Sequence, residues 1–336
     1  MPNYWIDVVS ETEFGLSRAG VYEQLLGRKH TFNHDSRSVT ISLPTKSAIE
    51  KRKREFPTDP RIWIGQRSGS GPRRKDGKIF NWYSDLTVRV SVEIPTKLRV
   101  PRRALMGAPN MYVCMCTSEQ KRAQALLKSA IPVAFSAFLY WLRVMRWQTK
   151  SGLIGQPNAE NIMDTYGASL IVLGPRKSFG YGTGHMTVRA IHILDQTDWA
   201  NIGKMVKRGV EPPLWSEILF EAEAFAACDN IRAAIAYYAF ACETFLRSMF
   251  MSQLPNDLNA NVYEIIDRQL SVRALMTRYA SREFKSKLSN GTLSTIHRLI
   301  DARDDVVHRG LTGAISNEDL VKFRTAARDL VFQGNR

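Results

Sequence analysis

The chain has 336 residues, of which 44% are hydrophobic and 24% charged. This composition excludes a disordered or collagen-like chain, and the length is more than one ordinary core requires and enough for two. The formal net charge is +15, and the excess lies in one part of the chain: residues 1–211 contain 32 basic and 17 acidic side chains, whereas residues 212–336 contain 15 of each. A basic part of this kind either meets an anionic partner or aids solubility, and composition does not separate the two.

The termini, apolar runs and cysteines predict a cytoplasmic protein. The first residues, Met-Pro-Asn-Tyr-Trp-Ile-Asp, lack the basic start and apolar run of a signal peptide. The longest apolar run, residues 131–142, is too short to span a bilayer, so no membrane is expected as a partner. Four cysteines are too few for a disulfide framework, and we expect reduced thiols at Cys114, Cys116, Cys228 and Cys242.

Alternating hydrophobic residues predict strands within residues 1–211. Residues 38–43 and 86–94 alternate most clearly, and each is followed by a proline, Pro44 or Pro95, which should end the strand. Shorter candidate strands are residues 61–64, 111–115, 170–173 and 186–194. Such alternation is typical of a sheet with one face in water.

Between these strands, residues 118–147 have hydrophobic side chains at three- and four-residue spacing, which predicts a helix. Pro132 within the segment favours either a kink or two shorter helices. The expected buried stripe comprises Leu126, Leu127, Ile131, Phe135, Phe138, Leu139 and Leu142. Strands around one long helix predict an α+β domain over residues 1–211.

After a proposed linker at residues 210–213, the pattern becomes helical. Helices are predicted at residues 214–226 and 231–249, with one or two short helices within 261–287, and at 293–308 and 317–332. Asp229 is a candidate N-cap of the second helix, Gly310 a candidate C-cap, and Ser316 with Asp319 a candidate capping box. Residues 212–336 are therefore predicted to form an all-α bundle of four to six helices.

The segment Leu-Ile-Asp-Ala-Arg-Asp-Asp-Val-Val-His-Arg-Gly, residues 299–310, contains the sharpest pattern in the chain. Arg303 and His308 lie near the end of a predicted helix, and polar Asp304 directly follows the arginine. Here the chain resembles the HEPN superfamily, whose members carry an arginine, a polar residue, a few further residues and a histidine. The resemblance covers residues 212–336, and includes an opening Pro-Leu-Trp and an alanine-rich helix that ends in a glutamate before an aromatic residue.

The resemblance implies a domain that pairs with a second copy and, in many members, a metal-independent ribonuclease of a toxin or antiviral abortive-infection system. Residues 1–211 would then bind a protein or nucleic-acid trigger. In such cleavage a 2′-hydroxyl attacks the neighbouring phosphate of RNA. A histidine can move protons near neutral pH, and an arginine can hold a fixed positive charge on the phosphate oxygens. We therefore predict catalytic roles for Arg303, Asp304 and His308, with no metal and no cofactor.

Helical geometry constrains this site. Five residues advance about 500° on an ideal helix, so Arg303 and His308 lie about 140° apart and should not meet within one chain. Asp304 and His308 share a face, and we expect Asp304 to orient or charge the histidine. A homodimer that places Arg303 of one chain near His308 of the other would resolve the geometry.

Other interpretations of the same residues stay open. Arg303 and His308 could be surface or packing residues of a non-catalytic bundle that binds RNA or a nucleotide. The chain could also be a scaffold whose basic part docks an acidic protein. Glu243 lies within an apolar helix and is predicted to be a buried structural partner of an arginine such as Arg303 or Arg247.

Two basic loops are candidate RNA contacts. The glycine-rich residues 174–184 suit phosphate contact and base stacking, and the basic residues 67–77 suit contact with a nucleic-acid backbone. The simpler interpretations are a hairpin loop for the first and a solvated charge run for the second. The side chains that we single out are Arg73, Arg74, Lys75, Arg176, Lys177 and Tyr181, together with Arg309 beside His308. Cys114 and Cys116 have no second pair of ligands, so zinc is not predicted.

Overall fold

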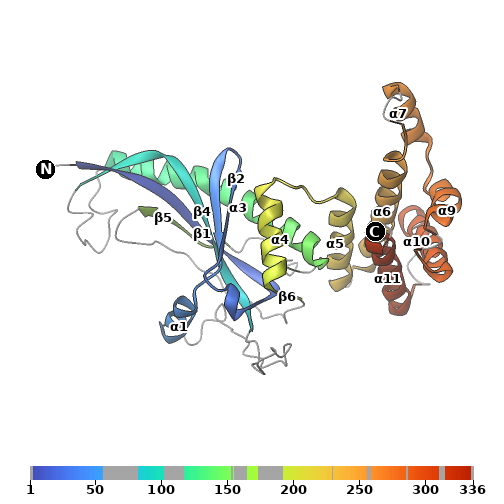
Figure 1. Cartoon of the computed structure of the whole chain (residues 1–336), viewed down its shortest axis with the longest axis horizontal. Coiled ribbons are helices and arrows are strands. Elements are labelled where there is room, and N and C mark those ends of the chain that lie inside the picture. The colour runs from blue at the N-terminus through green and yellow to red at the C-terminus, as the bar shows by residue number, and fades with distance from the viewer. Residues whose placement is uncertain are drawn as a thin grey trace. The chain divides into compact units, whose positions relative to one another are not determined.

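The computed structural model describes residues 3–55, 82–101, 117–152, 154, 165–172, 192–228, 230–255, 259–284, 287–309 and 315–333 (Figure 1). The chain divides into two compact units, Met1–Glu211 and Pro212–Arg336. Among the described residues, the first unit combines a sheet with helices and the second contains helices and turns. The predicted α+β class with a helical C-terminal part is confirmed.

The first unit is built on a sheet in which the described strands follow the order β2-β3-β4-β1-β5, with β6 also paired to β1. Among the described strands, β6 alone runs parallel to its neighbour. The strands are β1 (Asn3–Tyr22), β2 (Lys29–His34), β3 (Arg37–Ser42), β4 (Trp82–Pro101), β5 (Thr165–Val172) and β6 (His192–Leu194). The alternation predicted for β3 and β4 is confirmed, because Val39, Ile41, Leu86, Val88, Val90 and Val92 are all buried.

Strand β4 continues past Pro95, so the prediction that this proline ends the strand is wrong. In the ladder between β1 and β4, Asp7 lies opposite Lys97 whereas Val8 lies opposite Ile94. Two residues of β4 are therefore left over between these pairs, and Pro95 is one of them. A proline in a bulge costs no ladder hydrogen bond, because the bulged residue has no partner to donate to.

Strands β1 and β2 were not predicted from the sequence. Their inward positions include the polar residues Ser10 and Thr12 on β1 and His30 on β2, all of which are buried. Because these side chains interrupt the alternation of apolar and polar residues, hydropathy gives little sign of either strand. A short 3-10 turn (Glu23–Leu25) joins the two strands, and helix α1 (Lys46–Glu55) follows β3.

Helix α3 (Thr117–Thr149) lies along the sheet (Figure 1) and is a single helix through Pro132, which rules out the two-helix alternative. The predicted stripe is partly wrong, because Phe135 and Leu139 are 41% and 42% exposed. Phe138 and Leu142 of that stripe are buried, and the rest of the buried face includes the alanines Ala130, Ala134 and Ala137 together with Trp141 and Met145. Alanines let a helix approach the sheet closely, and they carry a weak hydropathy signal.

The stretch Lys121–Thr149 of α3 is, within the described residues, long and apolar enough to cross a bilayer by length and composition. The uninterrupted apolar run at residues 131–142 is shorter than a membrane span, so the sequence did not predict a helix of this length and hydropathy. In the structure 41% of the apolar window is buried. A helix that packs in a protein core passes the same test.

His30 joins β2 to α3 and to helix α4 (Gln196–Lys207). Its Nδ1 accepts a hydrogen bond of 3.0 Å from the indole nitrogen of Trp141. Its Nε2 therefore carries the proton and donates to the backbone carbonyl of Trp199 at 3.0 Å. The ring also stacks on Trp199, with 3.9 Å between centroids. Burial lowers the pKa of His30 to about 4, so the imidazole is neutral near pH 7.

The second unit is a bundle centred on α6, which packs against α5, α10 and α11. Its helices are α5 (Leu214–Ala227), α6 (Ile231–Met251), α7 (Ala260–Gln269), α8 (Val272–Ala274), α9 (Ser281–Glu283), α10 (Asn290–Arg309) and α11 (Asn317–Gln333), with a π-helical turn at Leu275–Ala280. The four longer predicted helices of this unit are confirmed, whereas residues 260–283 contain three helices and the π-helical turn, more than the one or two short helices predicted. The alanine-rich pattern of α6 allows this close packing, since Ala234, Ala239 and Ala241 are buried.

Local capping explains where two of these helices begin. Asn230 is the N-cap of α6, because its side chain accepts from the backbone nitrogen of Ala233. The candidate cap Asp229 is one residue away and lies outside the described residues, as does Gly310. Ser316 and Asp319 form the predicted capping box before α11, with the Ser316 hydroxyl 2.7 Å from the carboxylate. Hydrogen bonds from Ser316 and Arg298 lower the pKa of Asp319 to about 2.

Candidate functional site

Arg303 lies on α10 and faces α6. Its Nη2 atom is 3.7 Å from Oε2 of Glu243, and its Nε atom is 3.3 Å from Oδ1 of Asp304. The guanidinium carbon lies 5.7 Å from the centroid of the Phe240 ring. The side chain of Arg303 is 17% exposed. A positive charge therefore lies at the edge of the bundle between α6 and α10, supported by an aromatic ring.

The contacts of Arg303 are ion pairs without hydrogen-bond geometry. Its buried Nε atom has no hydrogen-bond partner among the described residues, although Asp304 is within ion-pair distance. The 3.7 Å contact with Glu243 is longer than a hydrogen bond. Because buried donors are almost always satisfied, this Nε atom is an exception, which it shares with the hydroxyls of Tyr238 and Tyr279 in the described part of the bundle.

Glu243 contacts both arginines that were predicted as its partners. Its Oε1 atom accepts a hydrogen bond of 3.1 Å from Nη2 of Arg247, one turn further along α6. Its Oε2 atom faces Arg303 at the longer distance of 3.7 Å. The carboxylate is 25% exposed, so it is half-buried rather than buried. One acidic group is thus shared unequally between two arginines.

Arg247 also binds the C-terminal end of α7. Its Nη1 atom donates to the carboxylate of Asp267 at 3.0 Å and to the backbone carbonyl of the same residue, and its Nη2 atom donates to the carbonyl of Leu270 at 3.0 Å. Carbonyls at a helix end lack partners within the helix. Burial by itself would lower the pKa of Arg247, but the hydrogen bonds of Asp267 and Glu243 raise it above its ordinary value.

The other predicted site residues are placed only in part. Helix α10 continues through His308 to Arg309, but the side chains of both lie outside the described residues. The described partner of Asp304 is Arg303, and its expected pairing with His308 stays a prediction. The two basic loops, with Arg73, Arg74, Lys75, Arg176, Lys177 and Tyr181, also lie outside the described residues, as do Cys114 and Cys116.

Apolar side chains are exposed on the same two helices as Arg303. Phe240 of α6 is 38% exposed and Val307 of α10 is 50% exposed. Phe240 continues a row of rings with Tyr237, at 6.2 Å between centroids, and Tyr237 in turn packs edge-on against Phe225. The helices that carry the candidate site therefore combine charge with solvent-exposed apolar surface.

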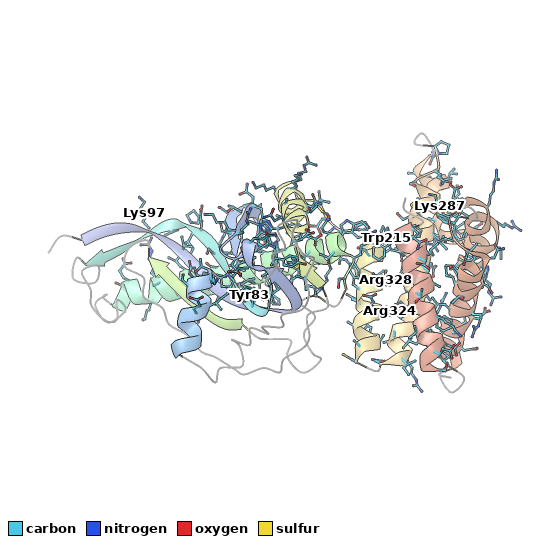
Figure 2. The ribbon with its side chains drawn as sticks, turned by 60° about the horizontal axis from the view of Figure 1, so that its bottom comes forward. Tyr83, Lys97, Trp215, Lys287, Arg324 and Arg328 are labelled. Atoms are coloured by element: carbon cyan, nitrogen blue, oxygen red, sulfur yellow. The ribbon has the colours of Figure 1, made fainter. Side chains whose placement is uncertain are left out.

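A second carboxylate of the bundle, Glu223 of α5, was missed by the sequence analysis. It is 2% exposed and binds Arg324 at 3.3 Å and, at closer range, Arg328. Both arginines project from α11 on the side of α5 (Figure 2). Burial and the Glu223 charge raise the pKa of Tyr238, whose buried hydroxyl has no partner among the described residues. The sequence did contain a sign of this cluster: Glu223 lies within the apolar pattern of one helix, and Arg324 and Arg328 are four residues apart on another.

His34, Asp35 and Ser136 meet in the first unit without forming a hydrolase triad. The Ser136 hydroxyl lies 2.9 Å from Nε2 of His34 and 3.4 Å from the carboxylate of Asp35. Asp35 approaches that same ring nitrogen at 3.7 Å, so it does not orient the ring through the other nitrogen as a triad requires. Ser136 lies within α3, and its hydroxyl also donates to Val133. The cluster fastens the β2–β3 turn to α3.

The described part of the chain contains no group of three or more His, Cys, Asp or Glu side chains that could hold a metal ion. Burial raises the pKa of the Cys242 thiol to about 12, which makes it unreactive, whereas Cys228 is exposed.

Comparisons with models of protein families, with curated proteins and with solved structures find no match to this chain. The resemblance to HEPN proteins therefore rests on the motif and helix pattern of residues 212–336.

Proposed function

We propose that residues 212–336 form a metal-independent endoribonuclease of HEPN type, with Arg303 and His308 as its catalytic residues. The observation that carries the proposal is the setting of Arg303: it is partly exposed, rests on the ring of Phe240 and holds no hydrogen bond among the described residues. A guanidinium in this state can bind a phosphate without first breaking a hydrogen bond.

The chemistry uses one proton acceptor, one proton donor and one fixed cation. His308 accepts the proton of an RNA 2′-hydroxyl while that oxygen attacks the adjacent phosphorus. The bond from phosphorus to the 5′-oxygen breaks, and the leaving oxygen takes a proton from a solvent water, so one His308 and one Arg303 suffice for each site. Arg303 binds the non-bridging oxygens, on which negative charge accumulates in the transition state. The products are a 2′,3′-cyclic phosphate and a 5′-hydroxyl.

A homodimer supplies the geometry that one chain lacks. Arg303 and His308 are separated by about 140° around α10, so a site that uses both needs a second copy. The exposed Phe240 and Val307 on the motif-bearing helices support such pairing, because burial of exposed apolar side chains favours association. We propose that two motifs face one cleft of this dimer.

The decisive experiment measures cleavage of labelled RNA in the presence of a chelator. Arg303→Ala and His308→Ala should each lower the rate by at least about 100-fold, and a mixture of the two variants should recover activity through hybrid dimers. Arg273→Ala is the matched control, because this exposed arginine pairs with Asp301 of α10 and should not affect cleavage. Full activity of both single variants would contradict the assignment.

The first unit supplies the basic surface in this proposal. Residues 1–211 hold the entire net charge of +15 and would bind RNA or an anionic trigger, in a cytoplasmic toxin or antiviral effector. Contacts with phosphates release counterions, so binding of RNA should fall steeply as salt is raised. Binding that does not depend on salt would argue against a phosphate contact.

A non-catalytic bundle is the second candidate function, and one observation favours it. Glu243 and Asp304 both lie within 4 Å of Arg303 and offset its charge, as they would for an arginine whose role is packing. Such a module would bind RNA or a nucleotide without cutting it. Retention of intact RNA by the wild-type chain, with no cyclic phosphate formed, would favour this function over the nuclease.

A further inference from the structure

Glu243 is the point at which two arginines of the bundle compete for one carboxylate. The bond to Arg247 is a hydrogen bond of 3.1 Å, whereas the approach to Arg303 is 3.7 Å and lacks hydrogen-bond geometry. Charge-assisted hydrogen bonds are short and strong, and longer ion pairs are weaker. The resting structure therefore directs most of the Glu243 charge to Arg247.

Arg247 holds this carboxylate firmly because Arg247 itself is fixed. Its other hydrogen bonds go to Asp267 and Leu270 at the C-terminal end of α7, where the helix dipole favours a cation. A guanidinium is a planar fork with five donors, so it can serve the carboxylate and the helix end together. The position of Arg247 is thereby set by α7 and not by Glu243 alone.

Without Arg247, the carboxylate of Glu243 would have Arg303 as its nearest cation. A small rotation of the Glu243 side chain would close the 3.7 Å gap between its Oε2 atom and Nη2 of Arg303. The two groups could then form a pair with two hydrogen bonds, which is the strongest arginine–carboxylate geometry. Such a pair would occupy the donors that Arg303 needs for a phosphate. Asp304 also offsets the charge of Arg303, but its 3.3 Å contact with Nε lacks hydrogen-bond geometry, and at 40% exposure it keeps more of its hydration than Glu243 does.

We propose that Arg247 is a positioning residue for the Arg303 site: it holds Glu243 away from Arg303 and so keeps the guanidinium available to a phosphate. The inference rests on the proposed function for the role of Arg303, but the competition for Glu243 exists whether or not the bundle cuts RNA. The hydrogen bonds of Arg247 to Glu243, Asp267 and Leu270 therefore link the availability of Arg303 to the C-terminal end of α7.

The experiment uses the full chain and reports on Arg303 directly. Phenylglyoxal modifies arginines, and pairing with a carboxylate slows the reaction, so peptide mass spectrometry gives a rate for Arg303 alone. Arg247→Ala should slow this modification about tenfold and raise the KM for RNA by a similar factor. Glu243→Gln should speed the modification, because the competing charge is gone.

The double variant shows whether Arg247 acts by holding the charge of Glu243 away from Arg303 or only by stabilising the fold. Arg247→Ala combined with Glu243→Gln should restore the modification rate of Arg303 and the KM to the values of Glu243→Gln alone. A merely structural role for Arg247 would give the same loss with or without the Glu243 charge, and that result overturns the proposal. Arg268→Ala is the matched control, since this exposed arginine of α7 pairs with Glu264 and should change neither measurement.

Two further outcomes remain informative. If far-UV circular dichroism shows that Arg247→Ala does not fold, Arg247→Lys replaces it, because a lysine keeps the charge but cannot bridge Glu243 and both carbonyls. The expected pattern is the same, and a modification rate equal to that of the wild type would overturn the proposal. If the wild-type chain does not cleave RNA, the proposed function fails while the phenylglyoxal rates still test the role of Arg247.

Discussion

Two carboxylates of the helical unit are each held by two arginines, and they differ in how completely they are held. Glu223 is 2% exposed and hydrogen-bonded to both Arg324 and Arg328. Glu243 is 25% exposed and hydrogen-bonded to Arg247, while Arg303 stays at ion-pair distance. In the first group both arginines hydrogen-bond to the buried carboxylate, whereas in the second Arg303 has no hydrogen bond to any residue that the structure describes.

This difference follows from what burial demands. A fully buried carboxylate must be matched by strong donors, because an unpaired buried charge costs several kcal/mol. A half-buried carboxylate keeps part of its hydration and can be shared. The closed Glu223 cluster therefore has the features of a structural ion pair, whereas under the proposed function the Glu243 cluster is where a phosphate of RNA binds.

Replacing one arginine of each cluster by lysine should affect RNA cleavage at Arg303 and thermal stability at Arg328. Arg303→Lys should lower RNA cleavage by about 100- to 1000-fold, because lysine lacks the fork that binds two phosphate oxygens. Arg328→Lys should lower the melting temperature and leave the cleavage rate of the folded chain unchanged. The two quantities are read from initial rates and from thermal unfolding. Equal losses of activity in both variants would remove the distinction between the clusters.

Neutralising the two carboxylates should lower the free energy of unfolding more at Glu223 than at Glu243. Glu223→Gln should lower the free energy of unfolding by about 3 kcal/mol, because it leaves two arginines around a neutral buried group. Glu243→Gln should cost less than about 1 kcal/mol, since water screens a more exposed pair. Urea unfolding followed by far-UV circular dichroism measures both. A larger cost for Glu243→Gln would mean that this carboxylate is the structural one.

His30 extends the comparison to a buried neutral group in the first unit. Its folded pKa of about 4 lies below the ordinary value of 6.5, so the unfolded chain binds a proton first as pH falls. The resulting stability is fully present above pH 6.5 and is lost as pH falls through that value towards 4, by up to about 3 kcal/mol. Unfolding measured against pH should show this loss. A His30→Gln variant with the same profile would exclude His30 as its source.

The smallest effect concerns the capping box, which lies apart from both clusters. Ser316→Ala removes the hydroxyl that accepts from the backbone of Asp319 and donates to its carboxylate. The free energy of unfolding should fall by about 1 kcal/mol, as is typical for loss of an N-cap. RNA cleavage should not change. Thermal unfolding and the cleavage assay together check this, and a loss of activity larger than the loss of stability would contradict it.

Much of the fold could be predicted because its signals are local. Helices α5, α6, α10 and α11 show their hydrophobic period within one segment, and the Ser316 capping box needs only four consecutive residues. The strand β4 was found for the same reason. Where an inward position is polar, as at Ser10, Thr12 and His30, the local signal disappears, and strands β1 and β2 were missed.

The candidate site also has a part that the sequence could predict and a part that it could not. Arg303, Asp304 and His308 stand within six residues of one another, so the sequence alone could single them out, and helical geometry alone could show that the arginine and the histidine diverge. The partners of these residues could not be derived in that manner. Glu243 offered two candidate arginines, and its unequal sharing between them depends on how α7 presents Asp267 and Leu270 to Arg247.

The two-part layout, the helical character of residues 212–336 and the concentration of positive charge before residue 212 could all be predicted from the order of the residues alone. Only the tertiary structure decided that Pro95 lies in a bulge, that His30 binds two tryptophans, and that Glu223 meets arginines 101 and 105 residues away. Periodicity and charge are properties of neighbouring residues, whereas the state of a buried or shared charge depends on groups that only the folded chain brings together.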